Sequence, residues 1–180
     1  EGSPTSNLPF RGGKGWLYEG GIREPMMMRW PGVTRPGSKC DVPVVSVDFL
    51  PTVLDIADVE LPKGKPIDGV SLVPLLEGGT EITRDAIYWH YPHYSNQGGF
   101  PGAAVRMGDW KLIERFEDGR VHLYNLKEDA SERNDLAGLP ENADRIEVMQ
   151  TKLHDWYKEV DAKFLEPLSD DSPMPWRPVE

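Results

Sequence analysis

The run most suggestive of chemistry is Arg11-Gly12-Gly13-Lys14-Gly15, in which a lysine has glycine on both sides. Flanking glycines let a backbone approach a ligand closely and take unusual dihedral angles. An ammonium group held in such a loop is a compact cation with three donors, and this suits a small tetrahedral oxyanion. On these five residues alone, a flexible surface loop with a solvated lysine is the better interpretation.

Two nucleotide-binding motifs are excluded for this run. A P-loop needs Ser or Thr directly after the lysine, whereas Gly15 stands there. A dinucleotide fingerprint fails because Tyr18 occupies the place of the third glycine.

A second cluster, residues 88–99, combines two histidines with four aromatic side chains and ends in an amide- and glycine-rich loop. Aromatic faces pack on sugar rings, and His, Asn and Gln offer partners to hydroxyl groups, so His93 and His90 are candidate substrate contacts. In a strand, however, His90 and His93 point to opposite faces, and one set of side chains could simply be core. Both interpretations stay open. A zinc site at the two histidines is the poorer one, because no third ligand is evident nearby.

Several elements must position these residues. Residues 1–24 are typical of an irregular loop, and 26–30 of a short buried strand closed by a Pro-Gly pair. Residues 47–59 carry a helical apolar stripe, with Asp48 as a plausible N-cap and Pro51 at the third helical position. Strands are expected at 86–91 and 103–116, with an Asp-Gly hairpin joining 111–116 to 120–126. A long helix is predicted over 141–164, because apolar residues recur there at helical spacing. Its apolar face consists of Ile146, Met149, Leu153, Trp156, Tyr157, Val160 and Phe164.

Composition narrows the function classes. The 180 residues carry a net charge of -10, which makes the chain a poor general binder of nucleic-acid phosphates or anionic lipid. A single cysteine, Cys40, excludes an internal disulfide framework and a cysteine-based zinc site. No apolar run approaches about 18 residues, so no membrane span is expected. The first residue is Glu1 and no signal peptide is present, so we expect a processed chain or part of a longer one.

The lysine run gains meaning from its surroundings, because a long stretch around it resembles the second signature of the sulfatases. These are formylglycine-dependent enzymes of the alkaline-phosphatase superfamily. Further matches follow in the family's order, and the resemblance covers roughly residues 3–164. The matching runs are Asn7–Pro25, Trp30–Gly32, Asp48–Asp55, Asp68–Leu72, Val105–Ile113 and Leu123–Leu126.

This resemblance implies a role for Lys14, which matches the lysine that contacts the sulfate group and would stabilise the charge of the transferring sulfuryl oxygens. The family's nucleophile comes from a Cys/Ser-x-Pro-x-Arg motif that this chain does not contain. Around Cys40 the proline comes one place late and valine replaces arginine, so Cys40 is interpreted as an ordinary structural or surface cysteine. The family's calcium ligands are also expected upstream, and this chain alone is expected to hold neither calcium nor a catalytic nucleophile.

The expected fold class is therefore α/β: the C-terminal part of an alkaline-phosphatase-like sulfatase fold, with a small antiparallel sheet packed by a long C-terminal helix. Residues 1–80 would end the catalytic domain, 81–164 would form a C-terminal subdomain, and 165–180 a Pro-rich extended tail. The missing N-terminal part of the catalytic domain would be the partner of this chain. The resemblance implies a periplasmic or extracellular enzyme.

The expected function is hydrolysis of a sulfated carbohydrate or an aryl sulfate by the intact enzyme, with no turnover by the 180 residues alone. Neither nucleic acid nor membrane is an expected partner. Three alternatives remain: a non-catalytic carbohydrate-binding domain, a phosphodiesterase or phosphonate hydrolase of the same superfamily, and a structural remnant whose parent lost its nucleophile.

Overall fold

The chain divides into two compact units in a computed structural model that describes residues 5–169 and 174–178. Residues 25–85 form one unit, and residues 1–24 together with 86–180 form the other. The first 24 residues therefore lie with the sheet, whereas the sequence grouped them with residues up to 80. Within the described residues, no helix is both long and apolar enough to cross a bilayer.

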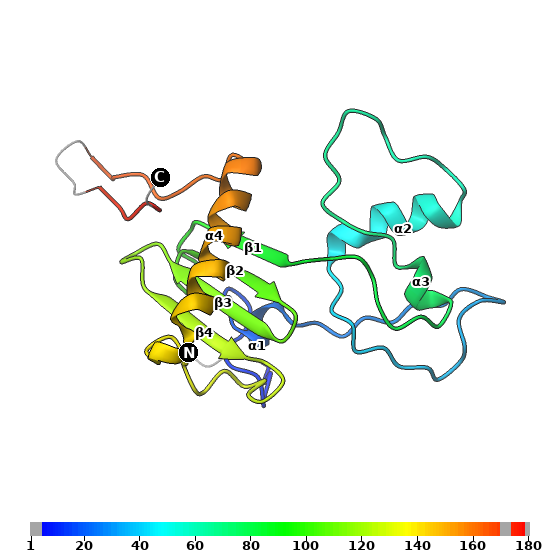
Figure 1. Ribbon diagram of the computed structural model, residues 1–180, viewed down its shortest axis with the longest axis horizontal. Coiled ribbons are helices and arrows are strands. Elements are labelled where there is room, and N and C mark those ends of the chain that lie inside the picture. Colours follow the sequence, from blue (N-terminus) through cyan, green and yellow to red (C-terminus); the bar gives the residue numbers. More distant parts are fainter. Residues whose placement is uncertain (1–4, 170–173, 179–180) are drawn as a thin grey trace. The chain divides into compact units, whose positions relative to one another are not determined.

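The larger unit is built on a four-stranded antiparallel sheet in the order β1-β2-β3-β4 (Figure 1). The strands are β1 Ile87–Tyr91, β2 Gly102–Met107, β3 Trp110–Arg115 and β4 Val121–Asn125. The hairpin between β3 and β4 is confirmed. The strand-like stretch 103–116 is two strands, because the chain reverses at Gly108-Asp109, a turn that the sequence analysis missed.

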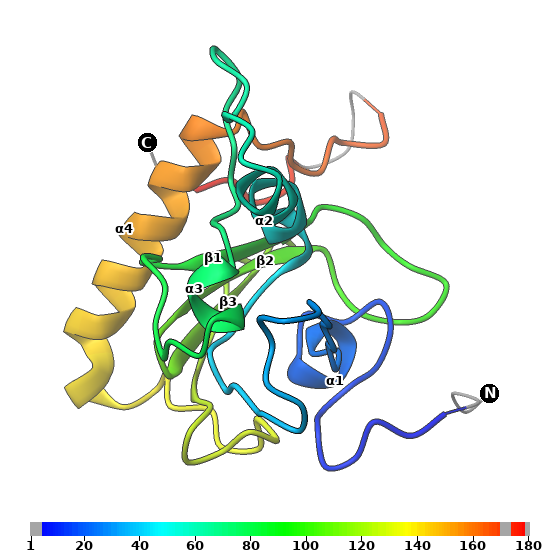
Figure 2. The same cartoon turned by 90° about the vertical axis from the view of Figure 1, so that its right-hand side faces the viewer.

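The helix α4, Ala143–Glu159, covers one face of this sheet (Figures 1 and 2). It follows a 3-10 turn, Pro140–Asn142. The predicted face is confirmed: its buried members Met149, Leu153 and Tyr157 pack in one cluster with strand side chains such as Leu112 and Leu123. Burying each large apolar side chain contributes about 1.5–3 kcal/mol. The helix ends before 164 because the chain turns at Asp161, whose φ is 49°.

The opposite face of the sheet carries the first part of the chain. Leu17 and Tyr18 pack against Ala104, Ile113 and Tyr124 in a second buried cluster. The four-residue helix α1, Glu19–Ile22, follows directly. Figure 2 shows the sheet between α4 on one side and α1 on the other. Alternation along each strand thus sends one set of side chains to α4 and the other to the α1 segment.

The smaller unit, residues 25–85, contains a 3-10 turn Ser46–Asp48, helix α2 Phe49–Ile56 and helix α3 Val73–Leu76. Pro51 is the third residue of α2, as predicted. Asp48 precedes α2, but its side chain makes no cap hydrogen bond. Instead its buried carboxylate accepts hydrogen bonds from Val45 N (2.8 Å) and Val70 N (3.1 Å) and pairs with Arg84.

The helix predicted within 47–59 is confirmed as α2, whereas the buried strand predicted at 26–30 is wrong. Residues 26–30 form no strand, and Met27 is 94% exposed. The apolar residues Phe49, Leu50 and Val53 of α2 are exposed as well. A strand needs a hydrogen-bonded neighbour, and an apolar stripe needs a covering layer. The described residues supply neither at these positions.

The predicted extended tail makes specific contacts where it is described. The ring of Trp176 stacks on Phe116, with centroids 5.9 Å apart. Arg177 donates a hydrogen bond to the carbonyl oxygen of Leu165. The described part of this segment, 174–178, therefore packs on the α4 side of the sheet.

Candidate functional site

Lys14 lies on an exposed loop in the first part of the larger unit, just before the buried residue Leu17. Within the described part of the chain its ammonium group has no hydrogen bond or ion pair. Gly15 has a φ of 93°, a conformation that residues with a Cβ rarely adopt. The loop therefore holds a free cation on a backbone whose turn depends on glycine.

The loop rests directly on α1 because α1 contains two glycines. A Cβ on Gly20 would lie 2.5 Å from the carbonyl oxygen of Arg11, and one on Gly21 would lie 2.1 Å from that of Trp16. These approaches are closer than any side chain permits. The backbone contact includes a hydrogen bond from Gly20 N to Arg11 O of 2.8 Å. Glycine is thus needed both in the loop and beneath it.

A buried charge cluster fixes α1 to the sheet. Lys111 of β3 is completely buried, and its Nζ lies 3.0 Å from Glu19 Oε1 and 2.9 Å from Glu132 Oε1. Glu132 Oε2 also accepts a hydrogen bond from the backbone N–H of Glu19. Arg23 also pairs with Glu19, at 3.7 Å and on the exposed side. Buried charges persist only when paired in this way.

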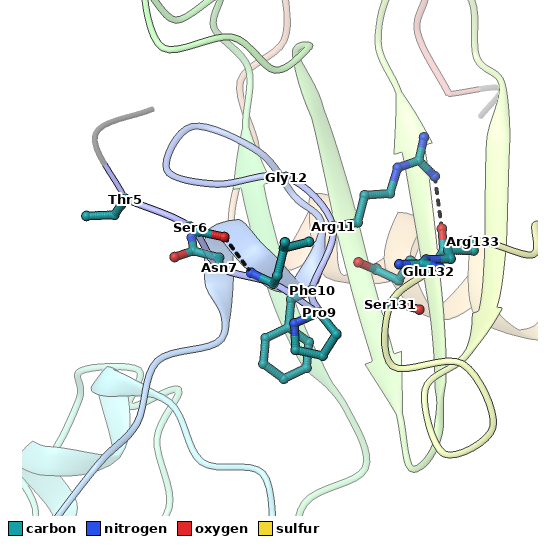
Figure 3. A pocket seen from close by; sticks show the side chains of 11 residues that line it. Thr5, Ser6, Asn7, Pro9, Phe10, Arg11, Gly12, Ser131, Glu132 and Arg133 are labelled. Carbon is teal, nitrogen blue, oxygen red and sulfur yellow. Dashed lines mark hydrogen bonds between the residues drawn. The ribbon is translucent and has the colours of Figure 1, made fainter. Parts of the chain in front are cut away.

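Glu132 has a further contact through its backbone. Its carbonyl oxygen accepts a hydrogen bond of 3.0 Å from Arg11, which crosses from the opposite loop (Figure 3). The Arg11 guanidinium also donates to the hydroxyl of Tyr124 and lies over the ring of Tyr18. Burial raises the pKa of the Glu132 carboxyl, and the opposing attraction of Lys111 does not cancel that shift.

The second predicted cluster is brought to the same loop. A Cβ built on Gly99 would lie 2.0 Å from the carbonyl oxygen of Gly15, and one built on Gly15 would lie 3.1 Å from Ser95 Oγ. The 95–99 loop therefore packs against the backbone next to Lys14. His93 is exposed at the start of this loop, with its ring edge-on to Tyr91 at 5.6 Å.

His90 lies on the other face of the sheet, as strand alternation predicts for one of the two histidines. Its ring packs with Phe116, Tyr157 and Phe164, and its Nε2 lies 2.6 Å from the carbonyl oxygen of Lys163. Burial lowers the pKa of this imidazole. These contacts give His90 a packing role, whereas His93 is exposed two residues before the loop that packs against Gly15.

The other two histidines, His122 and His154, have carboxylate partners. His122 Nδ1 lies 2.7 Å from Asp135, and His154 Nε2 lies 2.9 Å from Glu114. Both pairs tie neighbouring elements together. Neither pair contacts the Lys14 loop.

A cavity of about 620 Å³ opens between residues 5–12 and residues 131–133 (Figure 3). Arg11 and Glu132 line it, but Lys14 and His93 do not. The cavity therefore borders the supports of the loop and not the candidate cation itself.

Over the described ranges, no group of three His, Cys, Asp or Glu side chains is placed to bind a metal ion. Cys40 is an exposed free thiol, in keeping with its interpretation as a surface cysteine. The residues present thus do not fit the calcium and formylglycine that the family resemblance implies.

Comparison with known proteins decides the family. Residues 12–159 match the family model described as N-sulphoglucosamine sulphohydrolase, C-terminal. This chain belongs to the sulfatase family. The expected family and fold are confirmed, and the matched part is the C-terminal part.

Relatives of this sulfatase chain carry consistent names. It is 34% identical over 166 residues to a sulfatase of Formosa agariphila, covering 85% of this chain and 30% of the relative. It is 32% identical over 160 residues to an N-acetylglucosamine-6-O-sulfatase of Bacteroides thetaiotaomicron, covering 83% and 28%. The chain thus spans less than a third of the length of these relatives.

Solved structures agree with the sulfatase assignment. The structure of BT4656 in complex with its substrate D-glucosamine-2-N,6-O-disulfate superposes with a TM-score of 0.64 at 33% identity, over 74% of this chain and 28% of that one. A phosphonate monoester hydrolase from Silicibacter pomeroyi superposes with a TM-score of 0.56 at 23% identity, over 73% and 28%. That second likeness shows a shared fold alone.

Proposed function

We propose that this chain forms the C-terminal part of a sulfatase that hydrolyses sulfated carbohydrate, with Lys14 as the residue that contacts the sulfate group. The observation that carries the proposal is the exposed ammonium group of Lys14, which has no partner among the described residues, in a chain of the sulfatase family. A cation without a protein partner is available to an anionic ligand.

In the proposed reaction the S–O bond to the alcohol breaks, and water supplies the new oxygen on sulfur. The products are the free alcohol and hydrogen sulfate. Negative charge on the sulfuryl and bridging oxygens is where a fixed cation lowers the barrier most. Lys14 performs that task in this proposal. The nucleophile and the calcium ligands of the family would come from residues outside this chain.

The carbohydrate part of the substrate would lie against the 95–99 loop, which packs beside Lys14. His93 is exposed there and has both a donor and an acceptor nitrogen when neutral. The related N-acetylglucosamine-6-O-sulfatase and the structure with bound glucosamine disulfate support a sulfated amino sugar as the first substrate to try. The expected location, periplasmic or extracellular, stays a proposal.

A substrate panel tests this function. The intact sulfatase should release sulfate from glucosamine 6-sulfate and from an aryl sulfate, and it should cleave an aryl phosphonate ester far more slowly. The 180-residue chain alone should show no turnover. Preferred cleavage of the phosphonate ester would favour the phosphonate hydrolase alternative. Equal binding of sulfated and desulfated sugar without turnover would favour a carbohydrate-binding domain.

A further inference from the structure

We propose that Glu132 is a positioning residue for Lys14, because it holds the lysine loop to the rest of the unit on both sides of the lysine. The inference rests on the proposed function, in which Lys14 contacts sulfate. Glu132 itself touches neither Lys14 nor any bound ligand.

The contacts on the two sides use different groups of Glu132. On the N-terminal side, its carbonyl oxygen accepts a hydrogen bond of 3.0 Å from Arg11, three residues before Lys14 (Figure 3). On the C-terminal side, Oε2 accepts a hydrogen bond of 2.5 Å from the backbone N–H of Glu19, five residues after Lys14. One residue thus fixes both ends of the segment that presents the cation.

The same carboxylate is anchored to the sheet. Glu132 Oε1 lies 2.9 Å from the ammonium group of Lys111, and both side chains are completely buried. Lys111 belongs to β3, whose ladder with β2 and β4 makes it part of the most regular element of the unit. Glu132 therefore links the lysine loop to the sheet by direct contacts.

The segment that carries Lys14 depends on tertiary contacts for its geometry. Helix α1 has four residues, far too few to be stable without tertiary contacts. Glu132 has a φ of 53°, a left-handed conformation that non-glycine residues keep only where their surroundings hold it. Such a residue is placed by several contacts at once, which suits a residue that sets the position of others.

The matched control is Glu114, on the other face of β3. Its carboxylate is just as completely buried, but it accepts hydrogen bonds from Gln150, His154 and Tyr157 of α4 and none from the lysine loop. Replacing Glu114 disturbs the core of the same sheet without touching the supports of Lys14. A purely structural role for Glu132 would make the two variants alike.

The experiment measures kcat/KM of the intact sulfatase on a sulfated sugar for Glu132→Gln, Glu114→Gln and each combined with Lys14→Ala. Misplacing a catalytic group by about 1 Å can cost about 10²-fold, so we expect a loss of that order for Glu132→Gln. Glu114→Gln should stay within about twofold at a temperature where both variants are folded. In the Lys14→Ala background, Glu132→Gln should cost little more, because the group that it positions is gone.

Three results separate the outcomes. Full additivity of Glu132→Gln with Lys14→Ala, or equal losses for Glu132→Gln and Glu114→Gln, would overturn the inference. An unchanged kcat/KM for Lys14→Ala would instead overturn the proposed function. Should Glu132→Gln fail to fold, Arg11→Gln decides the matter: it breaks the contact with the Glu132 carbonyl at an exposed residue, and its loss must also vanish in the Lys14→Ala background.

Discussion

Each ionisable residue of this chain takes its role from its partners. Lys14 and Lys111 are chemically identical, but one is exposed without a partner and the other is buried between two carboxylates. His93 is exposed, whereas His90 packs among aromatic rings. The contacts of a side chain, and not its type, therefore separate the candidate site from its supports.

The residue scale also shows where the sequence was sufficient. The two glycines around Lys14 predicted an exposed lysine loop, and the alternation of the 88–93 segment predicted that one set of side chains, here including His90, could be core. The sequence could not predict Glu132. It stands in a polar loop that is typical of solvated surface, and its partners Glu19 and Lys111 are brought to it only by the folding of distant segments.

A pH experiment tests the packing role of His90. Burial lowers the pKa of this imidazole, so the unfolded chain takes up a proton before the folded one does. Stability is therefore complete above the ordinary value of about 6.5 and is lost as the pH falls through the lowered pKa. Thermal melts from pH 8 to pH 4.5 should show a steeper acid loss of Tm for the wild type than for His90→Phe. Parallel curves would refute this assignment.

At the scale of elements, predictions that rest on a pattern within one stretch of chain agree with the structure. The predicted strand that needed a neighbouring strand does not. The β3–β4 hairpin and the buried face of α4 follow from turn residues and apolar spacing within one stretch of chain. The predicted strand at 26–30 has no neighbour among the described residues, so its apolar sequence alone does not make it a strand. The apolar side chains Phe49, Leu50 and Val53 of α2 are likewise exposed, because no described residue covers them.

The close seating of the lysine loop on α1 gives a second test. In Gly21→Ala the new methyl group would meet the carbonyl oxygens of Trp16 and Gly13, at 2.1 and 2.4 Å. Such overpacking typically costs about 1–3 kcal/mol, so denaturant melts of the chain should show a lower midpoint. The control is Gly138→Ala, because a Cβ on Gly138 meets nothing within 4 Å. Equal midpoints for the two variants would show that the loop does not rest on α1.

At the scale of the whole molecule, the larger unit places three distant segments on one face of a sheet. The lysine segment contacts the 95–99 loop through Gly15 and contacts Glu132 through Arg11 and Glu19. The helix α4 stabilises the opposite face. One face of the sheet is therefore covered by α4, and the other face carries the candidate site.

Family membership was predictable from the sequence because the lysine signature is long and its residues are contiguous. The substrate is a different matter. Selectivity depends on which side chains meet the substrate, and in this chain His93 is the one proposed to do so. The chain covers about 30% of the length of its relatives, so most of that pocket would be formed by other residues.

The most direct test of the account is the kcat/KM of Lys14→Ala in the intact sulfatase on a sulfated sugar. Removing one donor that stabilises an oxyanion costs about 10²–10³-fold, and we expect a loss in that range. Lys127→Ala, an exposed lysine outside the site, should leave the rate unchanged. A Lys14→Ala enzyme that hydrolyses the ester as fast as the wild type would contradict the account.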